Sequence, residues 1–348
     1  MRRYPERMAR PHVLLFHAGG TLGMRRGPRG YAPSAGHLAD LLAGMPELQR
    51  PELPSYALVE PAPLLDSSDM RPADWQRVAD TLVEHQDGVD GFVVLHGTDT
   101  MAYTASALAF LLEGLDRPVI LTGSQIPLAE ARTDARENLI TALLLATRPE
   151  LAEVGVYAGG RLLRGVRATK TSSTGFEAFD TPDDAPLGSA GVTIELDGAR
   201  LRPAGRGPLR AARLRDAQVL ALRLFPGIGA ETLRNVLRDP VEGMVLEAYG
   251  AGNGPRDPAL LEVLREASER GVVIVAVTQC LRGGVRMRDY ATGSALADAG
   301  VVPGGDMTAE AALTKLLYLL SREADPDAVR RAVGHDLRGE LSGDAVRA

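Results

Sequence analysis

Two apolar runs that end in glycine and threonine constrain the fold of this chain most. Residues 13–21 read VLLFHAGGT, and residues 91–100 read GFVVLHGTDT. A short apolar run predicts a buried strand, and glycine at its end lets the backbone turn and approach a ligand closely. In open α/β sheets, ligands bind at the carboxyl ends of such strands. Threonine hydroxyls beside an acid at this edge indicate nucleophilic chemistry without a metal.

The use of lysine singles out one further residue. The chain has only two lysines, and its other 37 basic residues are arginine. Lys170 lies in the polar stretch RATKTSSTG, residues 167–175, whereas Lys315 lies in a helix-like stretch and is expected to make a structural or interface contact. Lysine can lose its proton when desolvated and then act as a base, whereas arginine stays protonated. Lys170 is therefore a candidate base, the alternative being a surface lysine without a role.

The chain alternates between strand and helix patterns, which predicts a mostly parallel sheet covered by helices on both faces. In the first half, the expected strands are 13–17, 91–96, 118–123 and 153–158, and the expected helices are 35–44, 72–86, 101–114 and 134–147. In the second half, the expected strands are 218–224, 243–248 and 271–278, and the expected helices are 230–238, 257–269 and 308–322. A stretch rich in glycine, proline and arginine separates the halves. We therefore expect an N-terminal α/β domain over 1–200, a linker over 201–216 and a smaller α/β domain over 217–348.

Composition narrows the class of protein. The 348 residues carry a formal net charge of -6, which does not indicate a nucleic-acid partner. Cys280 is the single cysteine, so no intramolecular disulfide can form. We expect it to lie in or near the core, the alternative being that it lines a regulatory pocket. The pattern fits a reducing compartment, and no apolar run reaches the length of a membrane span. We expect a cytoplasmic protein without a membrane segment.

A stretch just after the first apolar run has the composition of a mobile loop. Residues 24–33, MRRGPRGYAP, combine three arginines with several turn-forming residues. Because this loop follows Thr21 closely, it is a candidate lid that would exclude water on closure. A plain solvated loop is the alternative.

Three longer motifs carry a family resemblance. They are LHGTDTMAYTASAL at 95–108, PVILTGSQIPLAE at 118–130 and DSSDM at 66–70. With these motifs, residues 12–341 resemble the bacterial cytoplasmic (type I) L-asparaginases. The resemblance implies a two-domain asparaginase-type fold and hydrolysis of the asparagine side-chain amide to aspartate and ammonia. It also implies that neither a metal nor an organic cofactor takes part.

The resemblance also assigns catalytic roles. Thr21 matches the first catalytic threonine of the family and is the candidate nucleophile, with Tyr31 as the lid tyrosine that interacts with its hydroxyl. Thr98, Asp99 and Lys170 resemble the second catalytic group, in which the lysine acts as base towards Thr98 or its bound water. Which threonine attacks first, and whether an acyl-enzyme forms, is left open by the sequence.

Substrate contacts follow from the same resemblance. Ser67 and Ser68 would bind the α-carboxylate and α-amino groups, and Asp99 would pair with the ammonium. Asn253 matches a loop that family members offer to the active site of a neighbouring subunit. The resemblance therefore implies a homodimer, or a homotetramer built from two such dimers.

The chain departs from the family pattern at three places. Ala18 replaces a threonine in the first loop, and His17 stands where an aromatic hydroxyl is common. Some type I members are activated by asparagine at a second site, which Thr169, Glu247 and Cys280 resemble in position. Glu247 stands where an arginine would hold the ligand's carboxylate, and like charges repel. We therefore expect weak or absent activation. His17 and His96 are expected to be structural.

Three other functions remain as alternatives. A broader amidase would also accept glutamine, because one methylene is worth only about 1–3 kcal/mol of discrimination. An enzyme that supplies ammonia to a mischarged tRNA would need an added RNA-binding segment, which the chain lacks room for, and its charge is unsuited to RNA. A non-catalytic asparagine sensor would be expected to have lost Lys170 or a threonine, and these are all present.

Overall fold

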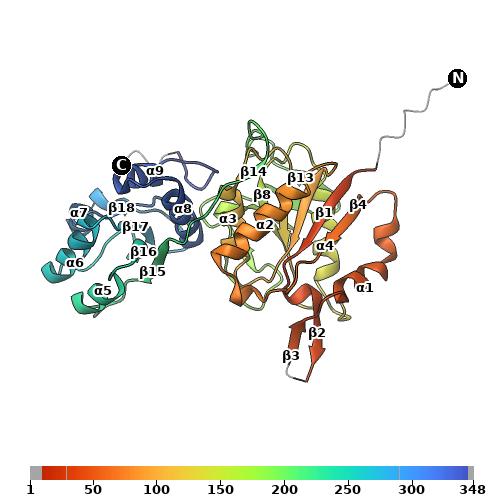
Figure 1. Ribbon diagram of the computed structural model, residues 1–348, viewed down its shortest axis with the longest axis horizontal. Helices are drawn as coiled ribbons and strands as arrows, with labels where there is room; N and C mark the ends of the chain where they lie inside the picture. Colours follow the sequence, from red (N-terminus) through yellow and green to blue (C-terminus); the bar gives the residue numbers. More distant parts are fainter. Residues whose placement is uncertain (1–9, 29, 290, 344–348) are drawn as a thin grey trace.

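The predicted strands of the first half form the centre of an eight-stranded sheet (Figure 1). The computed structural model describes residues 10–28, 30–289 and 291–343, so both outer ends of the predicted domains, 1–9 and 344–348, lie outside the described residues. The five strands from β8 to β4 pair in parallel, and the other three pair antiparallel. In sheet order the strands are β13 (Ile194–Leu196), β12 (Gly188–Ala190), β9 (Arg161–Arg164), β8 (Val154–Ala158), β7 (Val119–Thr122), β5 (Gly91–Leu95), β1 (His12–His17) and β4 (Ser55–Val59).

Side chains of β1 alternate between two cores, as the pleat of a strand requires. Leu14 and Phe16 pack into the cluster that contains the apolar residues of α2 and α3. Val13 and Leu15 pack into the cluster that contains those of α1 and α4. The sheet is thus covered on both faces, as the sequence predicts. The four helices are α1 (His37–Ala43), α2 (Pro72–Glu84), α3 (Met101–Leu111) and α4 (Ala135–Leu145).

The second half forms a four-stranded parallel sheet with helices on both sides. Helices α5 to α7 share one core with this sheet, and α8 and α9 share the other. The strands are β15 (Gln218–Arg223), β16 (Val241–Ala248), β17 (Val273–Thr278) and β18 (Val302–Pro303). The helices are α5 (Ala230–Val236), α6 (Pro258–Glu269), α7 (Ala291–Asp298), α8 (Ala309–Arg322) and α9 (Pro326–Val333).

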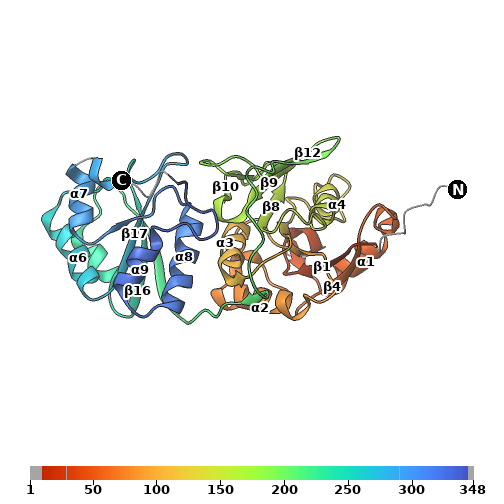
Figure 2. The ribbon, with the colours of Figure 1, turned by 90° about the horizontal axis from the view of Figure 1, so that it is seen from above.

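One apolar core continues across the boundary between the two domains. Helix α8 lies beside α3, as Figures 1 and 2 both show, and residues of both helices belong to the same cluster. Lys315 of α8 is fully buried and forms an ion pair of 2.6 Å with the equally buried Glu340. The expectation of a structural role for Lys315 is therefore confirmed.

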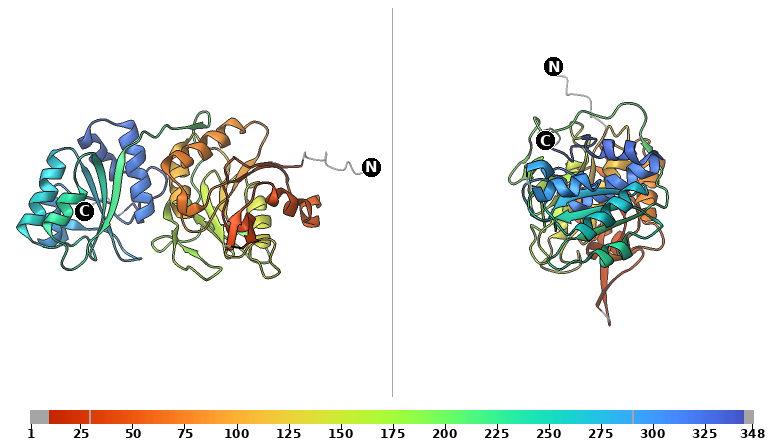
Figure 3. Two further views of the ribbon diagram at one scale, coloured as in Figure 1. Left: turned by 60° about the horizontal axis from the view of Figure 1, so that its bottom comes forward. Right: turned by 90° about the vertical axis from the view of Figure 1, so that its left-hand side faces the viewer.

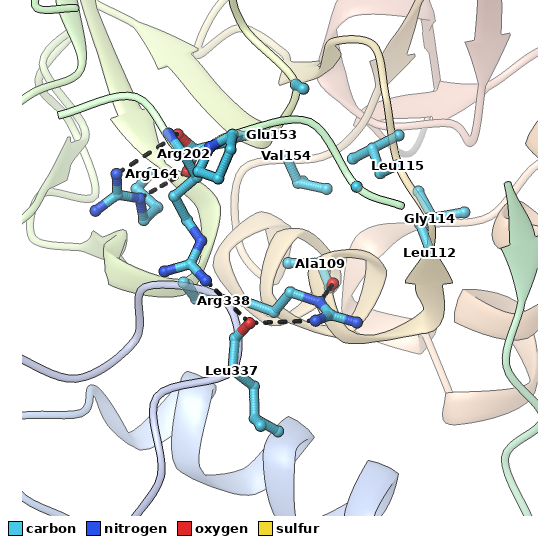
Figure 4. A pocket seen from close by; sticks show the side chains of 14 residues that line it. Ala109, Leu112, Gly114, Leu115, Glu153, Val154, Arg164, Arg202, Leu337 and Arg338 are labelled. Carbon is cyan, nitrogen blue, oxygen red and sulfur yellow. Dashed lines mark hydrogen bonds and ion pairs between the residues drawn. The ribbon is translucent and has the colours of Figure 1, made fainter. Parts of the chain in front are cut away.

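The segment that was predicted to be a linker also contacts both domains. Within it, β14 (Arg210–Ala211) pairs antiparallel with β6 (Leu112–Glu113), directly after α3. Figure 4 shows the cavity where this segment meets the C-terminal residues. There Arg338 donates to the carbonyl oxygens of Ala109 and Leu337, and Arg202 donates to Leu337 as well. These contacts fix the two domains against each other.

A two-stranded hairpin projects from the N-terminal domain (Figures 1 and 3). It consists of β2 (Met24–Gly27) and β3 (Gly30–Pro33), and so coincides with the loop that the sequence marks as a candidate lid. Tyr31 on β3 is 43% exposed. Within the described residues, no helix is long and apolar enough to cross a bilayer.

Candidate active site

Glycines bring three loops together at the carboxyl ends of β1 and β5, which are neighbours in the sheet. Gly20 has φ of 92°, and a Cβ there would lie 2.2 Å from the backbone nitrogen of Gly97. A Cβ on Gly97 would in turn lie 2.3 Å from the Oγ of Ser67. Any side chain at these two positions would push the loops apart. Glycine therefore allows the loops that carry Thr21, Ser67 and Thr98 to pack directly against one another.

Lys170 joins two of the predicted catalytic residues. Its Nζ lies 2.9 Å from Thr98 Oγ1 and 2.6 Å from Asp99 Oδ1. The side chain of Lys170 is 19% exposed, whereas that of Asp99 is 67% exposed. Because an ion pair with so exposed a partner adds little stability, its main effect is to orient the ammonium towards Thr98. A proton can pass directly between the Thr98 hydroxyl and the Lys170 amine in this arrangement.

The strand that carries Lys170 lies outside the large sheet. It is β10 (Thr169–Lys170), and it pairs only with β11 (Phe179–Asp180) within the described residues. No local pattern in this stretch predicts its approach to Thr98, which depends on tertiary packing. Only the family resemblance implied that Lys170 acts towards Thr98.

Gln125 is a site residue that the sequence analysis missed. The Thr98 hydroxyl donates to Gln125 Oε1 at 3.2 Å, and Gln125 Nε2 donates to the carbonyl of Gly175 at 3.1 Å. Gln125 follows β7, which is the strand next to β5. The argument from strand ends that selected Thr98 would have found it. Its contacts orient the Thr98 oxygen so that one lone pair faces the Lys170 amine.

The two predicted serines lie on the turn η3 (Ser67–Asp69), beside the Thr98 loop. Ser67 is buried, and its carbonyl accepts a hydrogen bond from the Thr100 hydroxyl at 2.7 Å. Ser68 is more accessible, and its hydroxyl donates to Asp66 at 2.9 Å. Thr100 is the N-cap residue of α3 by position, but its side chain makes no capping hydrogen bond, so the capping role expected of this residue type is replaced by the contact to Ser67.

Thr21 and Tyr31 are near in sequence, but their hydroxyls are not paired. Thr21 begins the turn η1 (Thr21–Gly23), directly before the hairpin. The Tyr31 hydroxyl donates to Glu130 Oε1 at 2.6 Å, and this hydrogen bond raises the pKa of Tyr31 above its ordinary value. Within the described part of the chain, no hydrogen bond joins it to Thr21. Glu130 belongs to the 118–130 motif, but no sequence signal pointed to this contact.

Asn253 lies in the C-terminal domain, and its contacts are made there. Its Oδ1 accepts from the Thr292 hydroxyl at 2.5 Å, and its backbone bridges to Tyr249. The single chain therefore brings Thr98, Asp99 and Lys170 into contact with one another, but it does not bring Asn253 to them.

Both histidines at the strand ends form hydrogen bonds with neighbouring structural groups. His96 is fully buried, with its ring nitrogens next to the Gly97 carbonyl and the Thr104 hydroxyl, and burial lowers the pKa of His96 to about 4. His17 pairs with Glu60 at 2.8 Å. Among the described residues, neither ring forms a hydrogen bond with a predicted catalytic hydroxyl, so the expected structural role of both histidines agrees with the geometry.

The residues predicted to form a second site line one cavity between the domains. Thr169, Glu247 and Cys280 all contribute to it. The expectation that Cys280 lies in or near the core is wrong, because its side chain is exposed on the loop after β17. The apolar run of β17 ends at Val277, three residues earlier, so the burial of that run does not extend to the thiol. Glu247 lies 3.7 Å from Arg223, whose charge partly offsets its own.

Among the described residues, no cluster of three or more histidine, cysteine or acidic side chains is arranged to hold a metal ion. The polar groups that converge at the sheet edge are hydroxyls, one ammonium, one carboxylate and one amide. Such a set can bind a small zwitterion and move protons between oxygen atoms and an amine.

Comparison with known proteins places this geometry in a family. Residues 12–202 match the family model "Asparaginase, N-terminal", and residues 218–333 match "Glutaminase/Asparaginase C-terminal domain". The chain is 50% identical to L-asparaginase 1 of Escherichia coli (strain K12), over 97% of this chain and all of that protein. Its fold matches the crystal structure of L-asparaginase I from Vibrio cholerae with a TM-score of 0.89 at 45% identity, covering 96% and 100% of the two chains. The L-asparaginase from Thermococcus kodakarensis matches with a TM-score of 0.84 at 35% identity, covering 95% and 99%.

Proposed function

The chain belongs to the asparaginase family, and we propose that it hydrolyses the side-chain amide of L-asparagine to L-aspartate and ammonia. The observation that carries this proposal is the contact of Lys170 with both Thr98 and Asp99. This contact supplies a group that can exchange a proton with a hydroxyl and a carboxylate that can hold a substrate ammonium. The two relatives named asparaginase 1 and I support the choice of substrate.

The proposed reaction begins at Thr21. Its hydroxyl oxygen attacks the amide carbon, its proton passes to the leaving nitrogen, and ammonia departs as the carbon–nitrogen bond breaks. Water then attacks the resulting ester while Lys170 and Thr98 take its proton. The bond between the Thr21 oxygen and the acyl carbon breaks, the proton returns to the Thr21 oxygen, and aspartate is released. Backbone N–H groups of the glycine loops would stabilise the oxyanion, each worth roughly 3 kcal/mol.

Transfer of the proton from Thr21 to the leaving nitrogen needs a further group, and Tyr31 is the candidate. In the described conformation its hydroxyl is bound to Glu130. The proposal therefore includes a movement of the hairpin that exchanges this contact for one with Thr21. Lids of this kind exclude water and complete a catalytic arrangement on closure.

Substrate binding is assigned to Ser67, Ser68 and Asp99. The carboxylate of Asp99 is exposed enough to pair with the α-ammonium of a bound amino acid while one of its oxygens stays on Lys170. No metal or organic cofactor is required by this scheme.

The proposal includes a second copy of the chain, which would supply Asn253 to the site. The support is the resemblance of its loop to one that family members offer to a neighbouring subunit, together with the contacts of Asn253 in its own domain rather than with Thr98 or Lys170. Mixing Thr98→Val and Asn253→Ala subunits tests this: each homomer is expected to be weakly active, and reassociated hybrids are expected to regain activity because one of their sites is intact. Hybrids without such a gain would contradict the shared site.

The cytoplasmic location stays part of the proposal and rests on the single cysteine.

The main experiment measures initial rates of ammonia release from L-asparagine and from L-glutamine. We expect turnover of asparagine, much slower use of glutamine, and loss of activity in Thr98→Val. If ammonia release does not exceed that of the variant, the chain is a binding protein and the sensor alternative holds.

The same rate curve tests the second site. Because Glu247 would repel the carboxylate of an amino acid, we expect a hyperbolic curve with little activation by asparagine. A sigmoidal curve would contradict this expectation, and the contact between Arg223 and Glu247 would then be the first place to look for a carboxylate-binding group.

A further inference from the structure

A histidine and a glutamate meet beneath the base of the hairpin. His17 ends β1 and Glu60 follows β4, and these strands pair in parallel with Phe16 opposite Val59. The register therefore places His17 and Glu60 side by side, with Nδ1 2.8 Å from Oε1. His17 is only 1% exposed. This pair takes no part in the proposed chemistry.

Both ends of the hairpin contact this pair. Gly23, the residue before β2, packs against the imidazole, since a Cβ at that position would lie 2.6 Å from Cε1 and Nε2 of His17. Gly36, the N-cap residue of α1, follows β3 by three residues and donates its N–H to Glu60 Oε2 at 3.3 Å. One side-chain pair therefore touches the chain where it enters the hairpin and where it leaves it.

The protonation state of the pair follows from its surroundings. Burial lowers the pKa of His17, although Glu60 opposes the shift, so the ring is neutral near pH 7. Its proton lies on Nδ1, because the facing carboxylate oxygen can only accept. Nε2 faces Gly23 and has no hydrogen-bond partner among the described residues. An apolar ring would fill the same space without burying a polar atom, so filling space does not by itself account for a histidine here.

We propose that His17 and Glu60 are positioning residues that hold both ends of the β2–β3 hairpin and thereby set the orientation of Thr21 and Tyr31. Thr21 lies in the same short turn as Gly23, so a shift of that turn moves its hydroxyl directly. Tyr31 moves with the hairpin as a whole. The inference rests on the proposed function for its catalytic consequence, but the anchoring itself can be measured without any substrate.

Two variants change the residues of the His17–Glu60 pair itself, which lie at the ends of β1 and β4. A third variant changes the turn residue that packs against the imidazole. Glu60→Gln removes the charge, His17→Phe removes the hydrogen bond while keeping a ring, and Gly23→Ala places a methyl group against the imidazole. The matched controls are His12→Phe and Gly198→Ala. His12 also lies on β1 and contacts Ser55 of β4 at 2.9 Å, at the other end of the same strands. A Cβ at Gly198 would meet no atom within 4 Å, and this glycine lies outside the hairpin that trypsin cleaves.

The first readout is the rate of tryptic cleavage after Arg25 and Arg26, which are exposed on β2, with the products identified by mass. We expect cleavage there to be several times faster in the three test variants, because both ends of the hairpin are loosened. The second readout separates kcat from KM for asparagine. Because a displacement of about 1 Å can cost on the order of 100-fold, we expect kcat to fall by about 10-fold or more, with a smaller change in KM.

The outcomes separate the two proposals. If Glu60→Gln matches the unmodified protein and Gly23→Ala matches its control in both cleavage and kcat, the positioning role is overturned. If cleavage accelerates but kcat is unchanged, the pair anchors the hairpin without positioning Thr21, and the catalytic part of the inference is wrong. If the unmodified protein releases no ammonia, the proposed function fails, while the cleavage rates still decide the anchoring. Should His17→Phe fail to fold by circular dichroism, the other two variants decide.

Discussion

The two halves of the proposed site are held in different ways. In the Lys170 half, which comprises Thr98, Asp99, Lys170 and Gln125, hydrogen bonds connect every member. In the hairpin half, which comprises Thr21, Tyr31 and Glu130, the tyrosine is bound to the glutamate and not to the threonine. The first half lies at strand ends inside the domain, and the second depends on a hairpin that projects from it (Figure 3). In the proposed mechanism, the Lys170 half is thus preassembled, whereas the hairpin half must rearrange before it can react.

The strongest test of the Lys170 half is Lys170→Arg. Arginine keeps the positive charge and can still pair with Asp99, but it does not give up its proton. If Lys170 exchanges a proton with Thr98, kcat for asparagine should fall by about 10²–10⁴-fold, the usual contribution of general acid–base catalysis. Lys315→Arg is not a suitable control because that lysine is fully buried, so Arg213→Lys, an exposed pair with Asp80, is used instead. Activity within a few-fold of the unmodified protein would mean that Lys170 acts only through its charge.

The second test compares Tyr31→Phe with Glu130→Gln. The hydrogen bond to Glu130 raises the pKa of Tyr31 and keeps its hydroxyl neutral, so the hydroxyl must leave Glu130 to assist Thr21. We expect Tyr31→Phe to lower kcat by about 100-fold, and Glu130→Gln to change it by only a few-fold. Steady-state kinetics with both variants checks this order. A larger loss in Glu130→Gln would mean that the contact to Glu130 belongs to the reactive conformation, and the two halves would then be equally preassembled.

The contrast between the strand-end half and the hairpin half also explains which strands and site residues could be predicted from the sequence. The strands β1 and β5 and the residues at their ends were found because a continuous apolar run with terminal glycine is a strong local signal. The short strands β12 and β13 at the sheet edge were missed, since three residues are too few for a pattern. Gln125 was missed although the strand-end argument applies to it.

Contacts between distant segments could not be predicted from local sequence patterns. Nothing local to Tyr31 indicates Glu130, which lies 99 residues further along the chain. The approach of β10 to Thr98 likewise depends on how β10 packs outside the main sheet. Thr98 and Lys170 were selected by the strand-end and lysine-usage arguments, and the family resemblance implied that the lysine acts towards Thr98. The structure adds the distance between their polar atoms.

The buried histidines His96 and His17, one beside each half, predict how the stability of the folded protein depends on pH. Burial lowers the pKa of His96, on the Lys170 side, to about 4, and it also lowers that of His17 on the hairpin side. As the pH falls below about 6.5, the unfolded chain takes up protons at these positions before the folded chain does, so stability is lost. For His96 the loss between pH 6.5 and 4 should approach about 3 kcal/mol, at about 1.4 kcal/mol per pH unit. Urea unfolding at several pH values measures it, and His96→Gln should show a shallower slope. Equal slopes would mean that the folded protein protonates His96 as readily as the unfolded chain.

The smallest expected effect comes from Ser68, which lies beside the preassembled half. Its hydroxyl donates to Asp66 at 2.9 Å, so its oxygen can accept from a substrate ammonium without giving up that bond. A bond formed in this way is exchanged against one to water and is worth about 1 kcal/mol. Ser68→Ala should therefore raise KM about 3–10-fold with kcat unchanged, because the ammonium is bound equally in the ground and transition states. Ser189→Ala, an exposed serine on β12, serves as the control. If kcat falls together with kcat/KM, Ser68 acts on the reacting end of the substrate, and the boundary between binding and catalytic residues in this half must be redrawn.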